Sequence, residues 1–314
     1  MKDISDNCTN ILKSCMGIAD GETVLIVSDK SKAELGRQFF SAAAALNARS
    51  QLIIMNNLEV SGQEPPKTVA AAMTQADAVI CVTEQSMTHT DAKITAVRNG
   101  VRVGTMPGIT EEMMMKGAVT ANYEMVEKYT KILTEKLCRA DSARIEKDGY
   151  VLRLDLKGRK GVPSTGRYVN AGEAGNIPSG EAYIAPNEML TEGSMIIDGS
   201  MEGMGLLSQP VVFEIEAGRV IGIQGDEGKL DILFSKEENA VVAELGIGTN
   251  PAAVLCGNIL EDEKVWGTVH IAFGSNTSFG GENKADCHMD GIILEPDLYI
   301  DEEKILEKGN FLIF

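Results

Sequence analysis

The sequence predicts an α/β fold in its first half and a strand-rich α+β fold in its second half. Two observations carry this prediction. Up to about residue 136, Val/Ile-rich runs alternate with helix-type segments, which is typical of a doubly wound, mostly parallel sheet. From Tyr150 onward, short segments alternate apolar and polar residues, as half-buried antiparallel strands do. We therefore expect an N-terminal domain at residues 1–145 and a strand-rich domain, carrying any metal site, at residues 146–314.

Four buried strands are expected in the first domain, and their β-branched runs are ETVLIVSD (22–29), SQLIIMN (50–56), AVICVT (78–83) and VRVGTM (101–106). Segments of helical composition separate them: KAELGRQFFSAAAALNA, TVAAAMTQAD and DAKITAVRNG. No G-x-G-x-x-G follows the first strand, so this Rossmann-like domain is not expected to bind NAD or FAD. The charged segment 110–147 is predicted to be helical.

The second half contains several strand patterns. VLRLDLKGR alternates leucine with polar residues, and AVVAELGIG and TVHIAFG are apolar strands. FEIEAGRVIGIQG predicts a β-hairpin with Phe213 and Ile215 facing inward and a turn at Ala217 and Gly218. The charged segment DEEKILEKG near the end is predicted to be a solvated helix.

Charge and targeting signals limit the possible partners and location. The chain has 46 acidic and 29 basic residues, a formal net charge of −17. Such a surface repels phosphate backbones and anionic membranes, so neither nucleic acid nor a membrane is expected as a partner. The N-terminus lacks the pattern of a secretory signal, and the six cysteines form no C-x-x-C pair. These features predict a cytoplasmic protein with reduced cysteines.

Two of the three histidines lie close together in the second half. If the segment around residue 288 is a strand, His288 and Asp290 point to the same face with Cα atoms about 7 Å apart. With His270 they provide two imidazoles and a carboxylate, which suits zinc or mononuclear non-haem iron. The alternative interpretation is that these are polar residues at strand ends with hydrogen-bonded partners.

Two glutamates in apolar surroundings support a metal site. Glu181 lies in NIPSGEAYIAP, and Glu244 lies in NAVVAELGIG. A carboxylate in such a place is costly unless it is paired or bound to a cation. Together with Asp290 they bring three negative charges, which two divalent cations would balance with room for a bound hydroxide.

The segments NIPSGEAYIAP, AELGIGTNP, HIAFG and CHMDG resemble, in order and rough spacing, motifs of the aminopeptidase T / aminopeptidase S metallopeptidase superfamily, which is leucyl aminopeptidase-like. Residues 83–109 are similar to the first domain of that superfamily. The resemblance implies a homodimer with two divalent metal ions (Zn, Co or Mn) per chain. By resemblance, the matching metal-binding positions are Glu181, Glu244, His270, His288 and Asp290.

The first functional expectation is therefore a metal-dependent aminopeptidase, a hydrolase that releases N-terminal residues from small peptides with a metal-activated water. Glu181 and Glu244 are the expected catalytic carboxylates, with Glu181 as general base or bridging ligand. Thr277 stands where the peptidases have a tyrosine at the metal site.

Two alternatives accompany this expectation. The same superfamily includes a 2,5-dihydroxypyridine ring-cleaving dioxygenase with a single Fe(II) held by two histidines and an aspartate, and His270, His288 and Asp290 would serve that chemistry equally well. The other alternative is a metal-binding or scaffold homologue without catalysis.

The third histidine belongs to the first half. His89, in SMTHTDAK, follows a predicted strand and precedes a predicted helix, which places it at the carboxyl edge of the sheet, where such sheets bind ligands. We expect it either to line the substrate cleft or to be a helix-capping or solvent-exposed residue.

Overall fold

The computed structural model describes residues 3–226 and 228–314 and divides the chain into two compact units. The first unit is Met1–Glu127 with Gly166–Ser179, and the second is Lys128–Thr165 with Gly180–Phe314. The predicted fold class is confirmed, because one parallel sheet and two largely antiparallel sheets are present. The single domain boundary at residue 145 stays a prediction.

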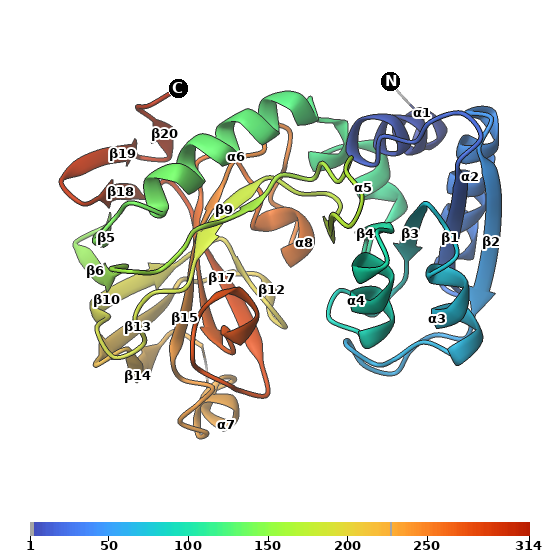
Figure 1. Ribbon diagram of the computed structural model, residues 1–314. Helices are drawn as coiled ribbons and strands as arrows, with labels where there is room; N and C mark the ends of the chain where they lie inside the picture. Colours follow the sequence, from blue (N-terminus) through green and yellow to red (C-terminus); the bar gives the residue numbers. More distant parts are fainter. Residues whose placement is uncertain (1–2, 227) are drawn as a thin grey trace. The chain divides into compact units, whose positions relative to one another are not determined.

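The first unit contains a five-stranded sheet in the order β2-β1-β3-β4-β8, with every pairing parallel (Figure 1). Its strands are β1 (Thr23–Asp29), β2 (Arg49–Met55), β3 (Ala78–Val82), β4 (Arg102–Thr105) and β8 (Ala174–Asn176). Its helices are α1 (Ile4–Asn10), α2 (Ala33–Ala45), α3 (Lys67–Met73), α4 (Asp91–Arg98) and α5 (Glu111–Met115), with shorter helical turns η1 (Ile11–Cys15) and η2 (Ala118–Thr120). The four strands expected from the sequence are all present.

Helices cover both faces of this sheet. Gly36 of α2 packs against Ser28 of β1, whereas Val27 of β1 shares a hydrophobic cluster with Val69 of α3 and Ala92 of α4. Because neighbouring strand residues point to opposite faces, α2 lies on one side and α3 and α4 lie on the other. This is the doubly wound arrangement predicted from the alternating pattern.

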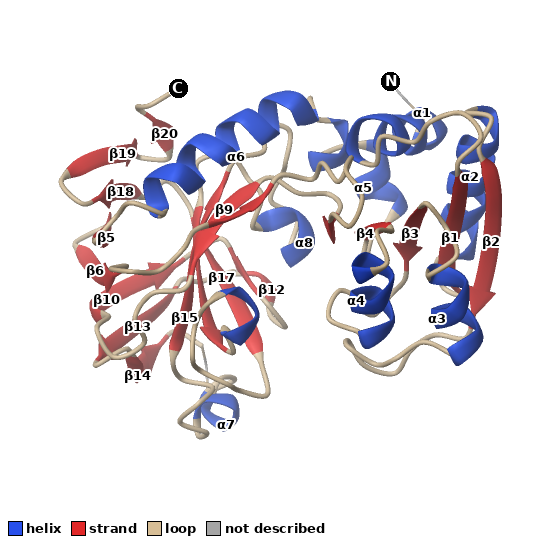
Figure 2. Cartoon of the chain, viewed as in Figure 1, coloured by secondary structure: helices blue, strands red, loops and turns tan. Residues whose placement is uncertain are grey.

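The second unit is built mainly from strands (Figure 2). An eight-stranded sheet has the order β14-β13-β10-β6-β5-β18-β19-β20, and its strands are β5 (Ser142–Lys147), β6 (Tyr150–Asp155), β10 (Glu192–Ile197), β13 (Val211–Glu216), β14 (Arg219–Gln224), β18 (Asp297–Ile300), β19 (Glu303–Glu307) and β20 (Asn310–Phe311).

A seven-stranded sheet has the order β12-β11-β17-β16-β15-β9-β7. Its strands are β7 (Val162–Ser164), β9 (Glu181–Ile184), β11 (Ser200–Met201), β12 (Gly205–Leu206), β15 (Val242–Gly248), β16 (Val269–Gly274) and β17 (His288–Ile293). The unit also contains the helices α7 (Asp231–Phe234) and α8 (Ile259–Asp262), the turn η3 (Thr277–Phe279) and most of α6 (Tyr123–Leu137).

The two sheets of the second unit share one hydrophobic core. Phe213 of the eight-stranded sheet contacts Phe273 of the seven-stranded sheet, with ring centroids 4.9 Å apart. Leu245 and Ile271 belong to the same buried cluster. One face of the seven-stranded sheet is therefore covered by apolar side chains, and its polar residues must use the other face.

The structure confirms the predicted hairpin and corrects two helices. β13 and β14 form the hairpin, with Ala217 (φ 46°) and Gly218 (φ 72°) at its turn. Residues 142–147 and 303–307 are strands rather than helices, because Ile145 and Leu306 pair into the eight-stranded sheet and bury their side chains in its core. Tertiary packing overrides the local helical composition there. No helix among the described residues is long and apolar enough to cross a membrane.

Candidate metal centre

The candidate site lies on the face of the seven-stranded sheet that is turned away from the core. Leu245 and Ile247 of β15 belong to the core, so alternation turns Glu244 and Gly246 to the opposite face. In the same way, the burial of Ile271 and Phe273 of β16 in the core turns its neighbour His270 to the site face. The predicted strand around residue 288 is β17, which turns His288 and Asp290 to one face as expected.

Strand register brings the polar residues together. Glu244, Ala272 and Asp290 lie opposite one another in a row across β15, β16 and β17. Gly246 lies opposite His270 in the adjoining row, and Glu181 of β9 lies opposite Gly248. Residues from four strands therefore face one small area.

Glycine makes the room that the histidine occupies. A Cβ atom added to Gly246 would overlap Nε2 of His270, so the imidazole lies directly over this glycine. Another residue at position 246 would have to displace a ring that is fully buried. The sequence GIG within β15 thus allows an imidazole to lie over the sheet.

The imidazole nitrogens and carboxylate oxygens lie within a few ångströms of one another. Nε2 of His270 is 3.3 Å from Oε2 of Glu181 and 3.4 Å from Oε1 of Glu244. Nε2 of His288 is 3.4 Å from Oε2 of Glu244 and 3.7 Å from Oδ1 of Asp290. Glu244 therefore lies between the two imidazoles, and the five residues predicted from the sequence form one cluster.

The donor atoms fit a divalent metal ion. Among residues 3–226 and 228–314, three groupings have ligand atoms within 4.8 Å of one another: Glu181, Glu244 and His270; Glu244, His288 and Asp290; and Glu263, His270 and Asp290. Oε2 of Glu181 and Oδ1 of Asp290 have no hydrogen-bond partner among the described residues, although both are buried. Buried carboxylate oxygens with imidazole nitrogens beside them are a donor set suited to zinc or iron.

Protonation in this cluster follows from the mutual proximity of acids and imidazoles. Burial alone would lower the pKa of His270, but the Glu181 and Glu244 carboxylates outweigh it and raise this pKa to about 10. Burial also opposes the charged form of His288, yet Asp290 and Glu244 raise its pKa well above the usual value. Burial would raise the pKa of Glu244, whereas hydrogen bonding to both imidazoles lowers it to about 2. Without a cation, the imidazoles therefore carry the positive charge that the carboxylates require.

A second layer of contacts orients His288. Its Nδ1 lies 2.8 Å from the carbonyl oxygen of Ser275, so an Nδ1–H group donates there and Nε2 is left to face the cluster. The adjoining Asn276 is fully buried and donates to Oε1 of Glu188 at 3.0 Å. Glu188 in turn forms an ion pair with Arg159. This network fixes the loop between β16 and β17 that orients the imidazole.

Sequence reasoning missed several residues of the site. Lys264 and Glu263 follow α8, and the ammonium group of Lys264 forms ion pairs with both Glu181 and Glu263. Tyr183 and Phe279 add aromatic rings: their centroids are 5.3 Å apart, and the centroid of Phe279 is 5.7 Å from that of His288. For Tyr183 a signal existed, because it lies two residues after Glu181 in a strand and so shares its face.

His89 belongs to the first unit, whereas the cluster lies within the second unit. It follows β3 and precedes Thr90, the N-cap of α4, and its side chain is exposed. This is the local position that the sequence predicted. Its expected contribution to a substrate cleft stays a prediction, as does the homodimer.

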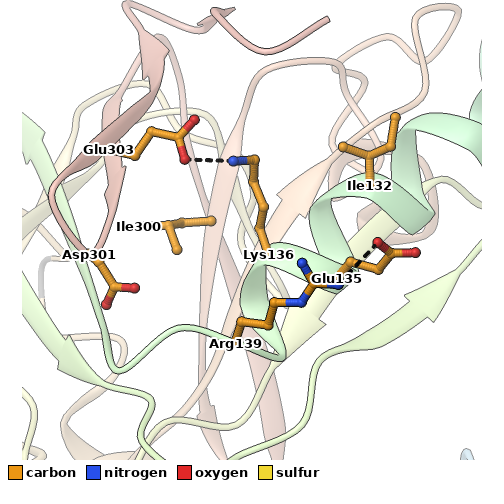
Figure 3. Close-up of a pocket in the computed structure, with 7 residues that line it drawn as sticks. All are labelled: Ile132, Glu135, Lys136, Arg139, Ile300, Asp301 and Glu303. Carbon is orange, nitrogen blue, oxygen red and sulfur yellow. Dashed lines mark hydrogen bonds and ion pairs between the residues drawn. The ribbon is translucent and has the colours of Figure 1, made fainter.

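Another hollow in the second unit has a different character (Figure 3). It lies between α6 and the β18–β19 connection, and it is lined by Ile132, Glu135, Lys136, Arg139, Ile300, Asp301 and Glu303. Its charges pair among themselves, since Lys136 contacts Glu303 at 2.6 Å and Arg139 contacts Glu135 at 3.8 Å. Its lining residues include no histidine or cysteine.

Comparison with known proteins identifies the family. The family model for 2,5-dihydroxypyridine 5,6-dioxygenase matches residues 3–313. This chain belongs to that family. A curated relative, the 2,5-dihydroxypyridine 5,6-dioxygenase of Pseudomonas putida KT2440, is 27% identical over 168 residues, which cover 47% of this chain and 48% of the relative. The chain thus matches about half the length of this relative.

Two solved structures share the fold of this dioxygenase-family chain. The 2,5-dihydroxypyridine dioxygenase from Pseudomonas putida KT2440 has a TM-score of 0.83 at 18% identity, covering 99% of this chain and 97% of the other. AmpT from Thermus thermophilus, an aminopeptidase T, has a TM-score of 0.71 at 15% identity and covers 99% of both chains. The chain therefore shares its fold with both proteins.

The expectation of an aminopeptidase is wrong, and with it the classification as a hydrolase and metallopeptidase. The family match and the curated relative both support the dioxygenase, which was the first alternative. The physical reason is that the shared motifs describe a strand framework for imidazoles and carboxylates, and that framework serves either reaction. Thr277, which replaces the tyrosine of the peptidases, lies in η3 beside the site strands. The assignment of individual ligands stays a prediction.

Proposed function

We propose that this protein is a non-haem Fe(II)-dependent dioxygenase that cleaves a small dihydroxylated heteroaromatic ring of the 2,5-dihydroxypyridine type. The observation that supports it most directly is that His270 and His288, from two adjacent strands, both lie beside Glu244, and that His288 also lies beside Asp290, in a chain of the dioxygenase family. Two imidazoles and one carboxylate that leave coordination positions open are the ligand set of non-haem Fe(II) oxygenases.

The residues of the site have distinct tasks in this proposal. His270, His288 and Asp290 would hold the iron. Glu244, which lies between the two imidazoles, would serve as a further metal ligand or as a hydrogen-bond acceptor. Bound Fe(II) supplies the redox chemistry by which a hydroxylated ring and dioxygen react. The hydrogen bond from Nδ1–H of His288 to the Ser275 carbonyl keeps Nε2 directed at the metal position.

An aromatic substrate suits the walls of the site. Tyr183 and Phe279 stand edge to face, and Phe279 stands edge to face against the imidazole of His288. Ring edges and faces of this kind bind a flat ring by stacking or edge contact, with about 0.5–1.5 kcal/mol for each favourable pair. Oε2 of Glu181 faces Nε2 of His270 at 3.3 Å but accepts no hydrogen bond, so it is an acceptor for a substrate hydroxyl.

The test is oxygen uptake by the iron-loaded protein. Protein loaded anaerobically with Fe(II) is mixed with 2,5-dihydroxypyridine and air-saturated buffer, and dioxygen consumption is recorded together with loss of the ring absorbance. We expect about one dioxygen consumed per ring, because both oxygen atoms enter the product. Protein without metal, or loaded with Zn(II), should leave the ring intact.

Two variants locate the activity. Asp290→Asn should abolish both ring loss and Fe(II) retention, since it removes a charged oxygen donor. Asp286→Asn is the matched control, because this carboxylate is exposed and pairs with the surface residue Lys236 at 2.5 Å. An iron-loaded wild type that leaves the ring unchanged, or equal activity in Asp290→Asn and wild type, would contradict the proposal.

A further inference from the structure

A lysine lies inside the acidic cluster. The side chain of Lys264 is fully buried, and its Nζ donates to Oε1 of Glu181 at 2.7 Å. The same ammonium group contacts Oε1 of Glu263. A lysine is almost never fully buried unless it is paired, so these two carboxylates are the reason that it can remain charged there.

Glu181 divides its two oxygens between two positive partners. Oε1 accepts from Lys264, and Oε2 faces Nε2 of His270 at 3.3 Å. A carboxylate with one cation on each oxygen is how two-metal sites bridge their ions. Here the outer partner of Glu181 is an ammonium group.

Lys264 also forms ion pairs with members of two of the three groupings of possible metal ligands described above. Its partner Glu181 belongs to the grouping with Glu244 and His270, and its partner Glu263 belongs to the grouping with His270 and Asp290. The ion pairs of the lysine that the structure describes are with Glu181 and Glu263, so His270, His288 and Asp290, the proposed iron ligands, are left to hold one metal ion with Glu244 between the imidazoles. One metal position is therefore available without displacing the ammonium group.

The Lys264 ammonium group lowers the negative charge that bound metal ions have to balance. When all are ionised, the carboxylates of Glu181, Glu244, Glu263 and Asp290 and the Lys264 ammonium carry a formal charge of −3. One divalent ion leaves −1, whereas two would leave +1 in a buried site. Without the lysine the charge would be −4, which two divalent ions neutralise.

We propose that Lys264 is a positioning residue that takes the place of a second metal ion and so restricts the centre to one divalent cation. This rests on the metal centre of the proposed function but concerns its stoichiometry and the residue that sets it. Removing the ammonium group frees an oxygen on Glu181 and one on Glu263, and both then face the position that the ammonium occupied.

The test measures bound metal and needs no turnover. Metal-free wild type, Lys264→Met and Lys264→Arg are equilibrated with Mn(II), freed of excess ion and assayed for manganese per chain. We expect about one ion in wild type and in Lys264→Arg, which keeps the positive charge, and about two in Lys264→Met. Lys304→Met is the control, because Lys304 pairs with Asp297 and Glu307 in the eight-stranded sheet and should leave one ion.

Electron paramagnetic resonance supplies an independent readout. A single Mn(II) gives an isolated-ion spectrum, whereas two ions about 3.5–4 Å apart are exchange-coupled. The coupled spectrum should appear only in Lys264→Met, or in Lys264→Gln if the methionine variant is insoluble. Two ions in wild type, or one ion in both soluble neutral variants, would overturn the proposal. Absence of ring cleavage with the expected stoichiometry would refute the proposed function and leave this inference intact.

Discussion

Replacing Gly246 with alanine tests the geometry of the metal centre most directly. Gly246 lies opposite His270 in the β15–β16 register, and an added Cβ would overlap Nε2 of that imidazole. His270 has no exposed surface, and Oε2 of Glu181 and Oε1 of Glu244 lie 3.3 and 3.4 Å from the same nitrogen. The ring can therefore make room only by moving away from the metal position or by pushing the strands apart.

Both responses have a predictable size. Overpacking a well-packed interior costs about 1–3 kcal/mol of unfolding free energy, and each kcal/mol lowers the melting temperature of a domain of 150–250 residues by roughly 2–4 °C. Disturbing the orientation of a ligand costs at least about 10–100-fold in metal affinity. Gly246→Ala should therefore melt several degrees lower and bind Mn(II) or Zn(II) at least tenfold more weakly.

Calorimetry measures both effects on the same samples. The metal-free protein is titrated with Zn(II), and thermal unfolding is recorded before and after metal addition. Gly222→Ala is the matched control, because it also lies within a strand and its added Cβ would meet chiefly the flexible side chain of Glu214. If Gly246→Ala binds zinc as tightly as Gly222→Ala does, Nε2 of His270 is not a ligand and our reasoning about the site fails.

Three further predictions concern protons, the loop and the core. Because neighbouring carboxylates raise the pKa values of His270 and His288, both imidazoles hold protons at neutral pH, and a metal ion must displace these protons when it binds. Metal affinity should therefore fall as the pH falls. Calorimetric titrations in buffers of different ionisation enthalpy should show about two protons released per bound ion. Asn276→Ala should weaken zinc binding at least tenfold in the same titration, since the loop carrying Ser275 loses its buried hydrogen bonds; an unchanged affinity would mean that the loop does not orient the imidazole. Phe213→Ala should lower the unfolding free energy in urea by about 3–5 kcal/mol without changing metal stoichiometry, because it lies in the core on the opposite side of the sheet; a changed stoichiometry would show that core and site are coupled.

The framework of the site could be predicted from the sequence because strand alternation is a local property. His288 and Asp290 are two residues apart, so any strand there must turn them to one face, and β17 does so. Glu181 and Glu244 stood out because carboxylates in apolar segments are costly. The ligand candidates were therefore visible without knowledge of the strand order.

Lys264 could not be predicted in this way. It lies in the charged stretch LEDEKVWG, and such a stretch is usually solvated. Only the tertiary structure places its ammonium group against Glu181, which is 83 residues away in the chain. The same limit explains the incorrect helix at residues 303–307, where the pairing of β18 with β19 outweighs local composition.

The chemistry was harder to predict than the site, for a related reason. Two imidazoles and several carboxylates are compatible with hydrolysis at two metals and with oxygen chemistry at one. The choice depends on how the surrounding charges, such as that of Lys264, limit the number of cations. Similar motifs therefore indicate which residues could be ligands, but they do not indicate how many cations the site can hold.

The row of Glu244, Ala272 and Asp290 has a consequence for how the protein reaches its native state. A slip of β17 by one residue would turn His288 and Asp290 together into the apolar core and bring Met289 to the site face. Both donors are thus gained or lost in a single step. A metal ion present during folding binds only chains whose strands are correctly aligned, and by mass action it enriches the native alignment over its neighbours.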